Sequence, residues 1–318
     1  MNDKIRIGTV GLGLMGSSIA TCLLAAGHTV TSLIKNIDKS DVAKERILGF
    51  LKQLKDEGLL NEDPEEVIKK LVITNDITRL SNHEVVIESI IEDLDEKKRV
   101  FRQLEAVLST DAIIGSNTSA IPVTILQEGL NHPERLLGIH WGEPAHILRF
   151  LEVICGNQSD LKYAEKIMRL AVGWHKEPSL VKKDIRGFIT NRLMYAMMRE
   201  GMHLVDKGYA TIEDIDRACR NDFGYWITFA GPFRFMDLTG IPAYLTVMKD
   251  LLPELDNADK PPVFFEELVA AGAKGVSNAH GFYPYTKESA ERWEKLFVEF
   301  AYEIRKLSEK YPQNIGDL

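Results

Sequence analysis

The sequence predicts an α/β protein in which a doubly wound, mostly parallel sheet is followed by an all-helical C-terminal domain. Three observations lead to this prediction. Apolar runs of strand length alternate with helical patterns through the first half of the chain, a glycine-rich segment follows the first run, and the second half shows helical periodicity only. Such alternation is typical of right-handed crossovers with helices on both faces of a sheet.

The first half is assigned from short apolar runs and from the amphipathic patterns between them. We expect strands at 5–10, 29–34, 71–74, 85–89, 112–115, 136–140 and 151–155, with a last strand within 176–183. We expect helices at 17–26, 39–57, 64–70, 94–108 and 159–174.

The sequence pattern changes at Ile185, where the apolar runs of strand length end and only helical periodicity continues. Apolar residues at helical spacing, such as Leu193, Met197 and Leu204, predict a long buried helix over 188–207. Further helices are expected at 211–220, 231–251, 262–272 and 286–310. We therefore predict two domains, an α/β domain over 1–184 and a helical domain over 185–318.

The glycine-rich segment lies between the first predicted strand and the first predicted helix. Gly11 permits a tight turn, Gly13 lets a pyrophosphate approach the backbone, and Gly16 lets the helix pack closely on its strand. Leu14 and Met15 complete the turn, and the helix that follows offers free N–H groups and a positive dipole end to phosphates. This context predicts a Rossmann-type dinucleotide site.

Composition and charge exclude several classes of protein. The 318 residues are 45% hydrophobic and carry a net charge of −8, which argues against a nucleic-acid or anionic-membrane partner. No apolar run has membrane-spanning length, and we expect no signal peptide, because the first predicted strand begins at Ile5. Cys22, Cys155 and Cys219 are odd in number and widely spaced, so we expect reduced thiols, no metal site and a cytoplasmic protein.

Polar residues follow several predicted strands, at the edge where such sheets bind ligands. Ser119 follows 112–115, His140 ends 136–140, Glu152 lies in the next strand, and Asn191 begins the first helix of the second domain. A histidine oriented by a carboxylate can accept the hydroxyl proton of an alcohol while hydride leaves to a nicotinamide. Hydroxyl and amide groups can orient the substrate oxygen.

Eight short motifs along the chain, taken in their order and at their separations, resemble the L-3-hydroxyacyl-CoA dehydrogenase family. The resemblance runs from Gly11 to Tyr285. Its markers are Gly11-Leu-Gly-Leu-Met-Gly16, Glu88-Ser-Ile-Ile-Glu92, Ser116-Asn-Thr-Ser119, His140, Leu151-Glu-Val153, Gly187-Phe-Ile-Thr-Asn191-Arg192, Gly231-Pro-Phe233 with Met236-Asp237, and Gly281-Phe-Tyr-Pro-Tyr285.

The resemblance implies a role for each matching residue. His140 would be the base paired with Glu152, Ser119 would bind the substrate oxygen, and Asn191 would support it from the helical domain. The resemblance also implies fatty acid metabolism and a homodimer formed through the second domain.

For the cofactor, the resemblance implies NAD, with Glu92 and Asn117 beside the nicotinamide ribose and ring. The family's usual acid at the end of the second strand is missing, because that position falls at Ile34 or Lys35. Either Asp38 serves through a longer turn, which keeps NAD, or Lys35 and Lys39 meet a 2′-phosphate, which favours NADP.

The substrate is left open by a second departure from the family pattern. Members commonly have His-x-x-Asn-Pro, whereas Glu143 stands at the asparagine position here. Unless Glu143 turns outward or pairs with Arg149, it repels an anionic substrate group. The alternatives are an acyl-CoA, for which Lys52 and Lys55 are candidate contacts, and a free hydroxy acid, a sugar acid such as L-gulonate, or a carnitine-like alcohol. A non-catalytic dinucleotide sensor is the remaining alternative from another class.

Overall fold

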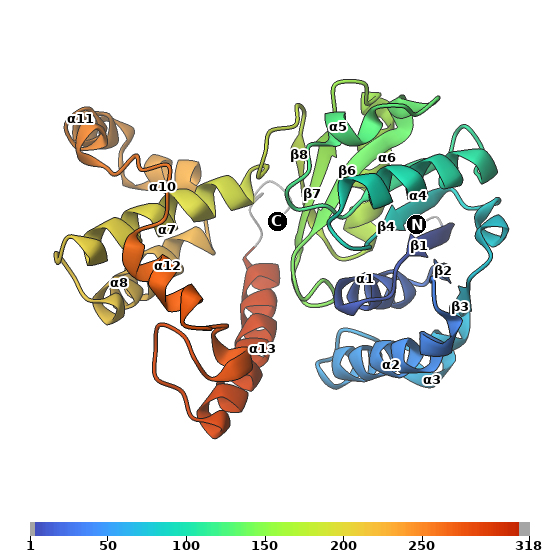
Figure 1. Cartoon of the computed structure of the whole chain (residues 1–318), viewed down its shortest axis with the longest axis horizontal. Helices are drawn as coiled ribbons and strands as arrows, with labels where there is room; N and C mark the ends of the chain where they lie inside the picture. The colour runs from blue at the N-terminus through green and yellow to red at the C-terminus, as the bar shows by residue number, and fades with distance from the viewer. Residues whose placement is uncertain (1–3, 312–318) are drawn as a thin grey trace. The chain divides into compact units, whose positions relative to one another are not determined.

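The computed structural model describes residues 4–311 and consists of two compact units. The first unit ends at Ile189 and the second begins at Thr190, so residues 185–189 cluster with the first unit. Figure 1 shows the chain from blue at its beginning to red near its end, with the sheet in the first unit and helices throughout the second.

Eight described strands form one sheet with the order β3-β2-β1-β4-β5-β6-β7-β8. All neighbours are parallel except β6 and β7, which the short connection 142–149 joins without a helix. The prediction of a doubly wound, mostly parallel sheet is confirmed. The strands are β1 (Arg6–Val10), β2 (Thr29–Leu33), β3 (Leu71–Thr74), β4 (Val85–Glu88), β5 (Ile113–Ser116), β6 (Leu136–Trp141), β7 (Phe150–Cys155) and β8 (Glu177–Val181).

The helices of the first unit follow the predicted order with small shifts at their ends. The first of them starts three residues earlier than predicted, because Gly13 caps it directly after the glycine turn. A short helix after β5 was not predicted, since its five residues are too few to show a period. The helices are α1 (Leu14–Ala25), α2 (Ser40–Asp56), α3 (Pro64–Val67), α4 (Leu94–Val107), α5 (Val123–Gln127) and α6 (Leu161–Gly173).

The core of the first unit fixes the strands against their helices. On one face, Phe101 and Leu104 of α4 pack with Val86 of β4 and Ile114 of β5, and all four are at most 1% exposed. Figure 1 shows α4 crossing the near side of this sheet. Burial of each such side chain contributes about 1.5–3 kcal/mol, which holds the strand ends, and the residues that follow them, in fixed positions.

The second unit is helical throughout its described part, apart from isolated bridges at His280. The expected helix over 231–251 is two helices, because Gly240 with φ +110° interrupts it. The expectation of a long buried helix is wrong: the helix forms over Thr190–Asp206 but contains no buried residue. The helices are α7 (Thr190–Asp206), α8 (Ile212–Ala218), α9 (Gly224–Ile227), α10 (Gly231–Thr239), α11 (Ile241–Leu251), α12 (Val263–Ala270) and α13 (Lys287–Lys310).

Candidate active site

Four parallel strands, β1, β4, β5 and β6, end along one edge of the sheet, which we call the carboxyl edge. Glu88 ends β4, Ser116 ends β5, and His140 is the second-last residue of β6. Glu152 lies in β7 directly opposite His140. The fold therefore brings predicted site residues from separate parts of the chain to one place.

Three of the predicted side chains form a hydrogen-bonded chain at this edge. Nδ1 of His140 lies 2.9 Å from Oε2 of Glu152, and Nε2 lies 3.2 Å from Oγ of Ser119. An ionised carboxylate can only accept, so Nδ1 carries the hydrogen and Nε2 is left with a lone pair toward the exposed Ser119. An imidazole held this way can accept a proton from a hydroxyl group, and the carboxylate then stabilises the charged ring.

The histidine and its carboxylate are shielded from water. Glu152 is fully buried and His140 is 7% exposed. The rings of Phe150 and Phe188 lie with centroids 5.5 and 5.6 Å from the imidazole. The N–H of Ile189 donates to Oε1 of Glu152 over 3.0 Å, so each carboxylate oxygen accepts at least one hydrogen bond.

A buried ion pair lies beside this chain. Nζ of Lys97 lies 2.6 Å from Oε1 of Glu88, and both side chains are at most 1% exposed. The N–H of Ile90 also donates to Oε1, and Oγ of Ser116 donates to Oε2, each over 2.7 Å. Lys97 reaches Glu92 as well, at 3.2 Å. The Glu88 carboxylate is thus satisfied on both oxygens, as a buried charge must be.

Glu92 links this ion pair to the segment that carries Ser119. Its Oε1 accepts from the N–H groups of Ser119 and Ala120, each over 3.1 Å, and from the hydroxyl of Thr118. Partial burial acts to raise the pKa of Glu92, but the Thr118 hydroxyl and the charge of Lys97 hold that pKa below its ordinary value. An ionised Glu92 therefore fixes the backbone at Ser119.

The glycine turn has the shape that a pyrophosphate requires. Gly11 has φ +93°, and an added Cβ there would lie 2.5 Å from the carbonyl oxygen of Ser89. An added Cβ on Gly16 would lie 2.1 Å from the carbonyl oxygen of Gly11, whereas one on Gly13 would meet nothing within 4 Å. Gly13 and Leu14 are exposed, Met15 is half-buried, and no described side chain caps α1. These residues fit a dinucleotide at the start of α1.

An arginine from α2 also reaches this turn. Nη1 of Arg46 lies 3.3 Å from the carbonyl oxygen of Leu12 and 3.3 Å from Oγ of Ser17. Arg46 is half-buried and has no ion pair among the described residues. Neither Arg46 nor Lys97 is predicted as a site residue, because basic residues on helices normally face solvent. For Lys97 a signal exists: it takes a position in the apolar stripe that continues through Val100, Phe101 and Leu104.

The residues predicted to contact the adenosine ribose or its 2′-phosphate follow the end of β2. Lys35, Asp38 and Lys39 are all exposed. Oδ1 of Asn36 accepts from the N–H of Asp38 over 3.0 Å and caps a short 3₁₀ turn, Ile37–Lys39. The chain thus turns immediately after β2, with lysine and aspartate side chains reaching solvent beside the carboxyl edge.

Glu143 is exposed and does not pair with the arginine that the sequence offers. Nη1 of Arg149 lies 3.5 Å from Glu177 instead. Of the two alternatives weighed for Glu143, pairing with Arg149 is therefore not observed, and the carboxylate is exposed to solvent. Its negative charge stays available to a ligand at the end of β6.

The connection 142–149 that carries Glu143 is anchored by two buried side chains. The backbone N–H of His146 donates to Oγ of Ser18 in α1 over 3.0 Å, and Nδ1 of His146 lies 2.7 Å from the same oxygen. Nζ of Lys176 donates to the carbonyl oxygens of Ala145 and Leu148. Because the backbone that follows Glu143 is held at residues 145–148, we expect Glu143 to keep its place when a ligand binds.

The two predicted asparagines lie in different units. Oδ1 of Asn117 accepts from the N–H of Trp141 over 2.9 Å, and its Nδ2 lies 3.3 Å from Oγ of Ser89, so this amide ties β4, β5 and β6 together. Asn191 is the second residue of α7 and belongs to the helical unit, so the geometry of the first unit does not include it.

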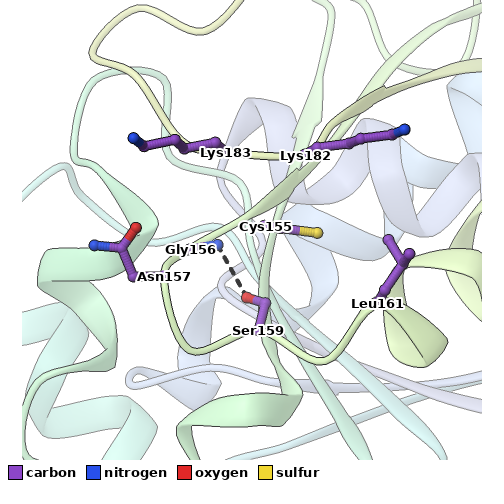
Figure 2. A pocket seen from close by; sticks show the side chains of 7 residues that line it. All are labelled: Cys155, Gly156, Asn157, Ser159, Leu161, Lys182 and Lys183. Carbon is purple, nitrogen blue, oxygen red and sulfur yellow. Dashed lines mark hydrogen bonds between the residues drawn. The ribbon is translucent and has the colours of Figure 1, made fainter.

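A cavity of about 350 Å³ lies at the opposite edge of the sheet, where β7 and β8 end. Figure 2 shows the amino groups of Lys182 and Lys183 in its wall pointing in opposite directions, so they do not converge on an anion. Burial raises the pKa of the Cys155 thiol in the same wall, which disfavours the reactive thiolate. This cavity lacks the chemistry of the carboxyl edge.

Residues 4–311 contain neither a cluster of metal ligands nor a helix that could span a membrane. No group of three or more His, Cys, Asp or Glu side chains there could hold a metal ion. None of the helices there combines the length and apolar character needed to cross a lipid bilayer.

Comparison with protein families matches nearly the whole chain to one family. Residues 6–185 match the NAD binding domain of 3-hydroxyacyl-CoA dehydrogenase, and residues 187–285 match its C-terminal domain. The expected resemblance to this family is confirmed, as is NAD as the cofactor.

Individual relatives differ in the substrates that their names state. A 5-formyl-3-hydroxy-2-methylpyridine 4-carboxylate 5-dehydrogenase of Mesorhizobium japonicum is 33% identical over 299 residues, which cover 92% of this chain and 96% of that protein. A crystal structure of an enzyme with this activity, described as an NAD⁺-dependent dismutase, matches with a TM-score of 0.88 and 29% identity, over 97% of this chain and all of that one. A probable 3-hydroxybutyryl-CoA dehydrogenase of Deinococcus radiodurans is 29% identical over 282 residues, which cover 88% of this chain and all of that protein.

Proposed function

Because the chain belongs to the 3-hydroxyacyl-CoA dehydrogenase family and is an NAD-dependent oxidoreductase of that type, we propose that His140, Glu152 and Ser119 form its catalytic group. The observation that carries the proposal is the unbroken hydrogen-bonded chain from the exposed Ser119 hydroxyl through the imidazole to the buried Glu152 carboxylate. A non-catalytic sensor would have no need of this chain.

In the proposed reaction, His140 takes the proton of the substrate hydroxyl at Nε2 as hydride leaves the same carbon. Bound NAD supplies the hydride acceptor. Ser119 orients the substrate oxygen, and Glu152 holds the imidazole in one tautomer and stabilises its positive charge. We assign Asn191 a supporting contact to the same oxygen from the helical unit. In the reverse direction, protonated His140 returns the proton to the carbonyl oxygen.

For cofactor binding we propose the glycine turn, with Gly13, Leu14 and Met15 facing the pyrophosphate and Lys35 near the adenosine ribose. Glu92 and Asn117 are proposed to lie beside the nicotinamide ribose and ring. Their hydrogen bonds to neighbouring backbone support this placement, because a fixed carboxylate and amide are suited to orienting a ring. Exposed Lys35 keeps NADP as the alternative.

For the substrate we propose a small free carboxylic acid whose reacting group is an alcohol or a hydrated aldehyde, with a hydroxyl or protonated nitrogen placed to meet Glu143. A hydrated aldehyde reacts as an alcohol does: the base removes a hydroxyl proton, hydride leaves the carbon, and a carboxylic acid results. The named substrate of the Mesorhizobium relative supports a free acid. The charge of exposed Glu143 supports the hydroxyl or protonated nitrogen at that position of the substrate.

An acyl-CoA is the second candidate, favoured by the relatives named 3-hydroxybutyryl-CoA dehydrogenase. The two lysines that could contact coenzyme A are engaged within this chain. Nζ of Lys52 lies 3.0 Å from Glu65, and Lys55 donates to the carbonyl oxygen of Asn61 over 2.6 Å. Exposed contacts of this kind are weak, so they reduce the case for coenzyme A without removing it.

A substrate panel separates the two candidates. Initial rates would be measured with 5-formyl-3-hydroxy-2-methylpyridine 4-carboxylate and NAD, and with acetoacetate and acetoacetyl-CoA and NADH. We expect kcat/KM to be highest for a free acid, and Glu143→Asn to raise the rate with acetoacetyl-CoA relative to the free acids. Faster turnover of acetoacetyl-CoA by the unmodified enzyme would contradict the free-acid proposal.

We also propose that the helical unit binds a second copy of this chain. No residue within helices α7 to α12 is buried, and large apolar residues such as Tyr225 and Phe233 are each 79% exposed. Helices that bury so little of their apolar surface need a partner surface to stabilise them. Sedimentation equilibrium tests the proposal: we expect a dimer, with Phe233→Asp shifting it toward monomer, whereas a monomer at all concentrations would contradict it.

We place the working enzyme in the cytoplasm. Cys22 and Cys155 are buried free thiols, and Cys219 is a half-buried one, as is usual where thiols stay reduced. Fractionation of cells carrying a tagged chain would test this placement.

A further inference from the structure

Phe188 lies two positions before the start of the helical unit, and its side chain is buried in the first unit. Phe188 is 1% exposed and packs in an apolar cluster with Val123, Ile154 and Val181. Its ring also lies against the imidazole of His140, with centroids 5.6 Å apart and planes tilted by 58°. One side chain thus contacts both the core of the unit and the proposed base.

The backbone at this position is strained. Phe188 has φ +50°, in the left-handed region that bulky side chains rarely adopt, and Gly187 before it has φ +84°. Non-glycine residues persist there only where their surroundings force them to. An aromatic residue at such a position indicates that its ring is needed where it lies.

The strained turn delivers a hydrogen bond to the catalytic pair. The next residue, Ile189, donates its N–H to Oε1 of Glu152 over 3.0 Å, while Oε2 of the same carboxylate faces Nδ1 of His140 at 2.9 Å. Helix α7 begins directly afterwards, at Thr190. Phe188 and Ile189 therefore act on the two members of the pair, one through its ring and the other through its backbone.

The segment before the turn is fixed as well. The carboxylate of Asp184 accepts from the N–H of Thr124 over 2.7 Å and from its hydroxyl over 2.9 Å, at the start of α5. The N–H of Phe188 donates to the carbonyl oxygen of Ile185 over 2.9 Å. Since residues 184–189 are tied down at both ends, the position of the Phe188 ring is set by the first unit itself.

We propose that Phe188 is a positioning residue for the base of this enzyme. Its ring covers one side of the imidazole, opposes rotation of His140 away from Ser119, and holds the strained turn that brings the Ile189 N–H to Glu152. The proposal rests on the assignment of His140 as the base. It adds a role for a residue outside the proposed catalytic group.

The test compares Phe188→Ala and Phe188→Leu with Val181→Ala, which removes another member of the same cluster, on β8, two strands away from the strand of His140. kcat, KM, the NADH dissociation constant and the melting temperature would be measured with the fastest substrate of the panel above. We expect kcat to fall about 10- to 100-fold for Phe188→Ala and several-fold for Phe188→Leu, with KM and NADH affinity within about twofold. Val181→Ala should lower the melting temperature and keep kcat.

The outcomes separate the positioning role from a structural one. If Val181→Ala loses as much kcat as Phe188→Ala at a similar melting temperature, the effect is general loosening and the proposal is wrong. If Phe188→Ala does not fold, Phe188→Leu decides: an unchanged kcat overturns the proposal. A separate result, full turnover by His140→Ala, would refute the base assignment itself whatever Phe188 does.

Discussion

His140 and Glu152 face each other directly across β6 and β7, the one antiparallel pairing among the described strands. Direct cross-strand partners have closely spaced side chains, and here Nδ1 and Oε2 are 2.9 Å apart. The pair is therefore set by the register of two buried strands. Its geometry does not depend on a loop.

The glycine turn offers a matched pair of substitutions. Gly13→Ala places a methyl group in open space where the pyrophosphate would lie, so we expect normal stability but NADH binding weakened by about tenfold or more. Gly16→Ala places its methyl 2.1 Å from the Gly11 carbonyl oxygen and should cost about 1–3 kcal/mol of stability. NADH titration by fluorescence and urea unfolding check both. Equal effects of the two variants on stability would contradict this reading of the turn.

Much of this arrangement could be predicted from the sequence. The strand order along the chain, the glycine turn and the residues Ser119, His140 and Glu152 all follow from apolar runs and the polar residues after them. The antiparallel pairing could not be read from those runs, because a buried strand looks the same in either direction. The one signal for it is the connection 142–149, which is short and has no helical pattern. A parallel pairing would need a longer crossover, usually through a helix.

Other features could not be predicted for a physical reason. The periodicity of α7 indicates only that one face of the helix is apolar. Whether that face is buried depends on the elements packed against it, which the periodicity does not indicate. The strained backbone at Phe188 has no signature in residue type, since phenylalanine is an unusual choice for that region. Lys97 is charged, and its burial depends on Glu88, a partner nine positions away.

Removal of one charge of the buried Lys97–Glu88 ion pair should destabilise the protein more than removal of both charges. Lys97→Met leaves the Glu88 carboxylate buried without its cation, so we expect a loss of about 3–5 kcal/mol in the free energy of unfolding. The double variant Glu88→Gln with Lys97→Met removes both charges and should recover a large part of that loss. Urea unfolding of the unmodified protein, of Lys97→Met, of Glu88→Gln and of the double variant measures the coupling, and strictly additive losses would show that the charges do not act together.

Glu92 should make stability depend on pH in the acid range. Its pKa is lowered in the folded protein from an ordinary value of 4.5, so its contribution is complete above 4.5 and is lost as pH falls through the lowered value. The stability difference between the unmodified protein and Glu92→Gln should therefore shrink between about pH 6 and about pH 3.5. Urea unfolding at several pH values measures it, with Glu45→Gln on the exposed face of α2 as the control. A difference that grows toward acid pH would have the wrong sign.

Arg46 should contribute to cofactor binding through the phosphates. Removing a half-buried guanidinium beside the glycine turn should weaken NADH binding by about tenfold, because hydrogen bonds to charged groups are among the stronger ones. Arg46→Ala would be compared with Lys44→Ala, which removes the same charge from an exposed position on α2. Adenosine binding should be unchanged in both. Equal NADH affinity for the two variants would leave Arg46 only a structural role between α1 and α2.

The most direct measurement is the rate of hydride transfer by His140→Ala, followed by NADH absorbance with the fastest substrate of the panel, alongside NADH binding by fluorescence. Loss of a general base costs about 10²- to 10⁴-fold in rate. The account predicts a fall of this size with NADH affinity unchanged, and a smaller fall for Glu152→Gln. Turnover by His140→Ala at the rate of the unmodified enzyme would contradict it.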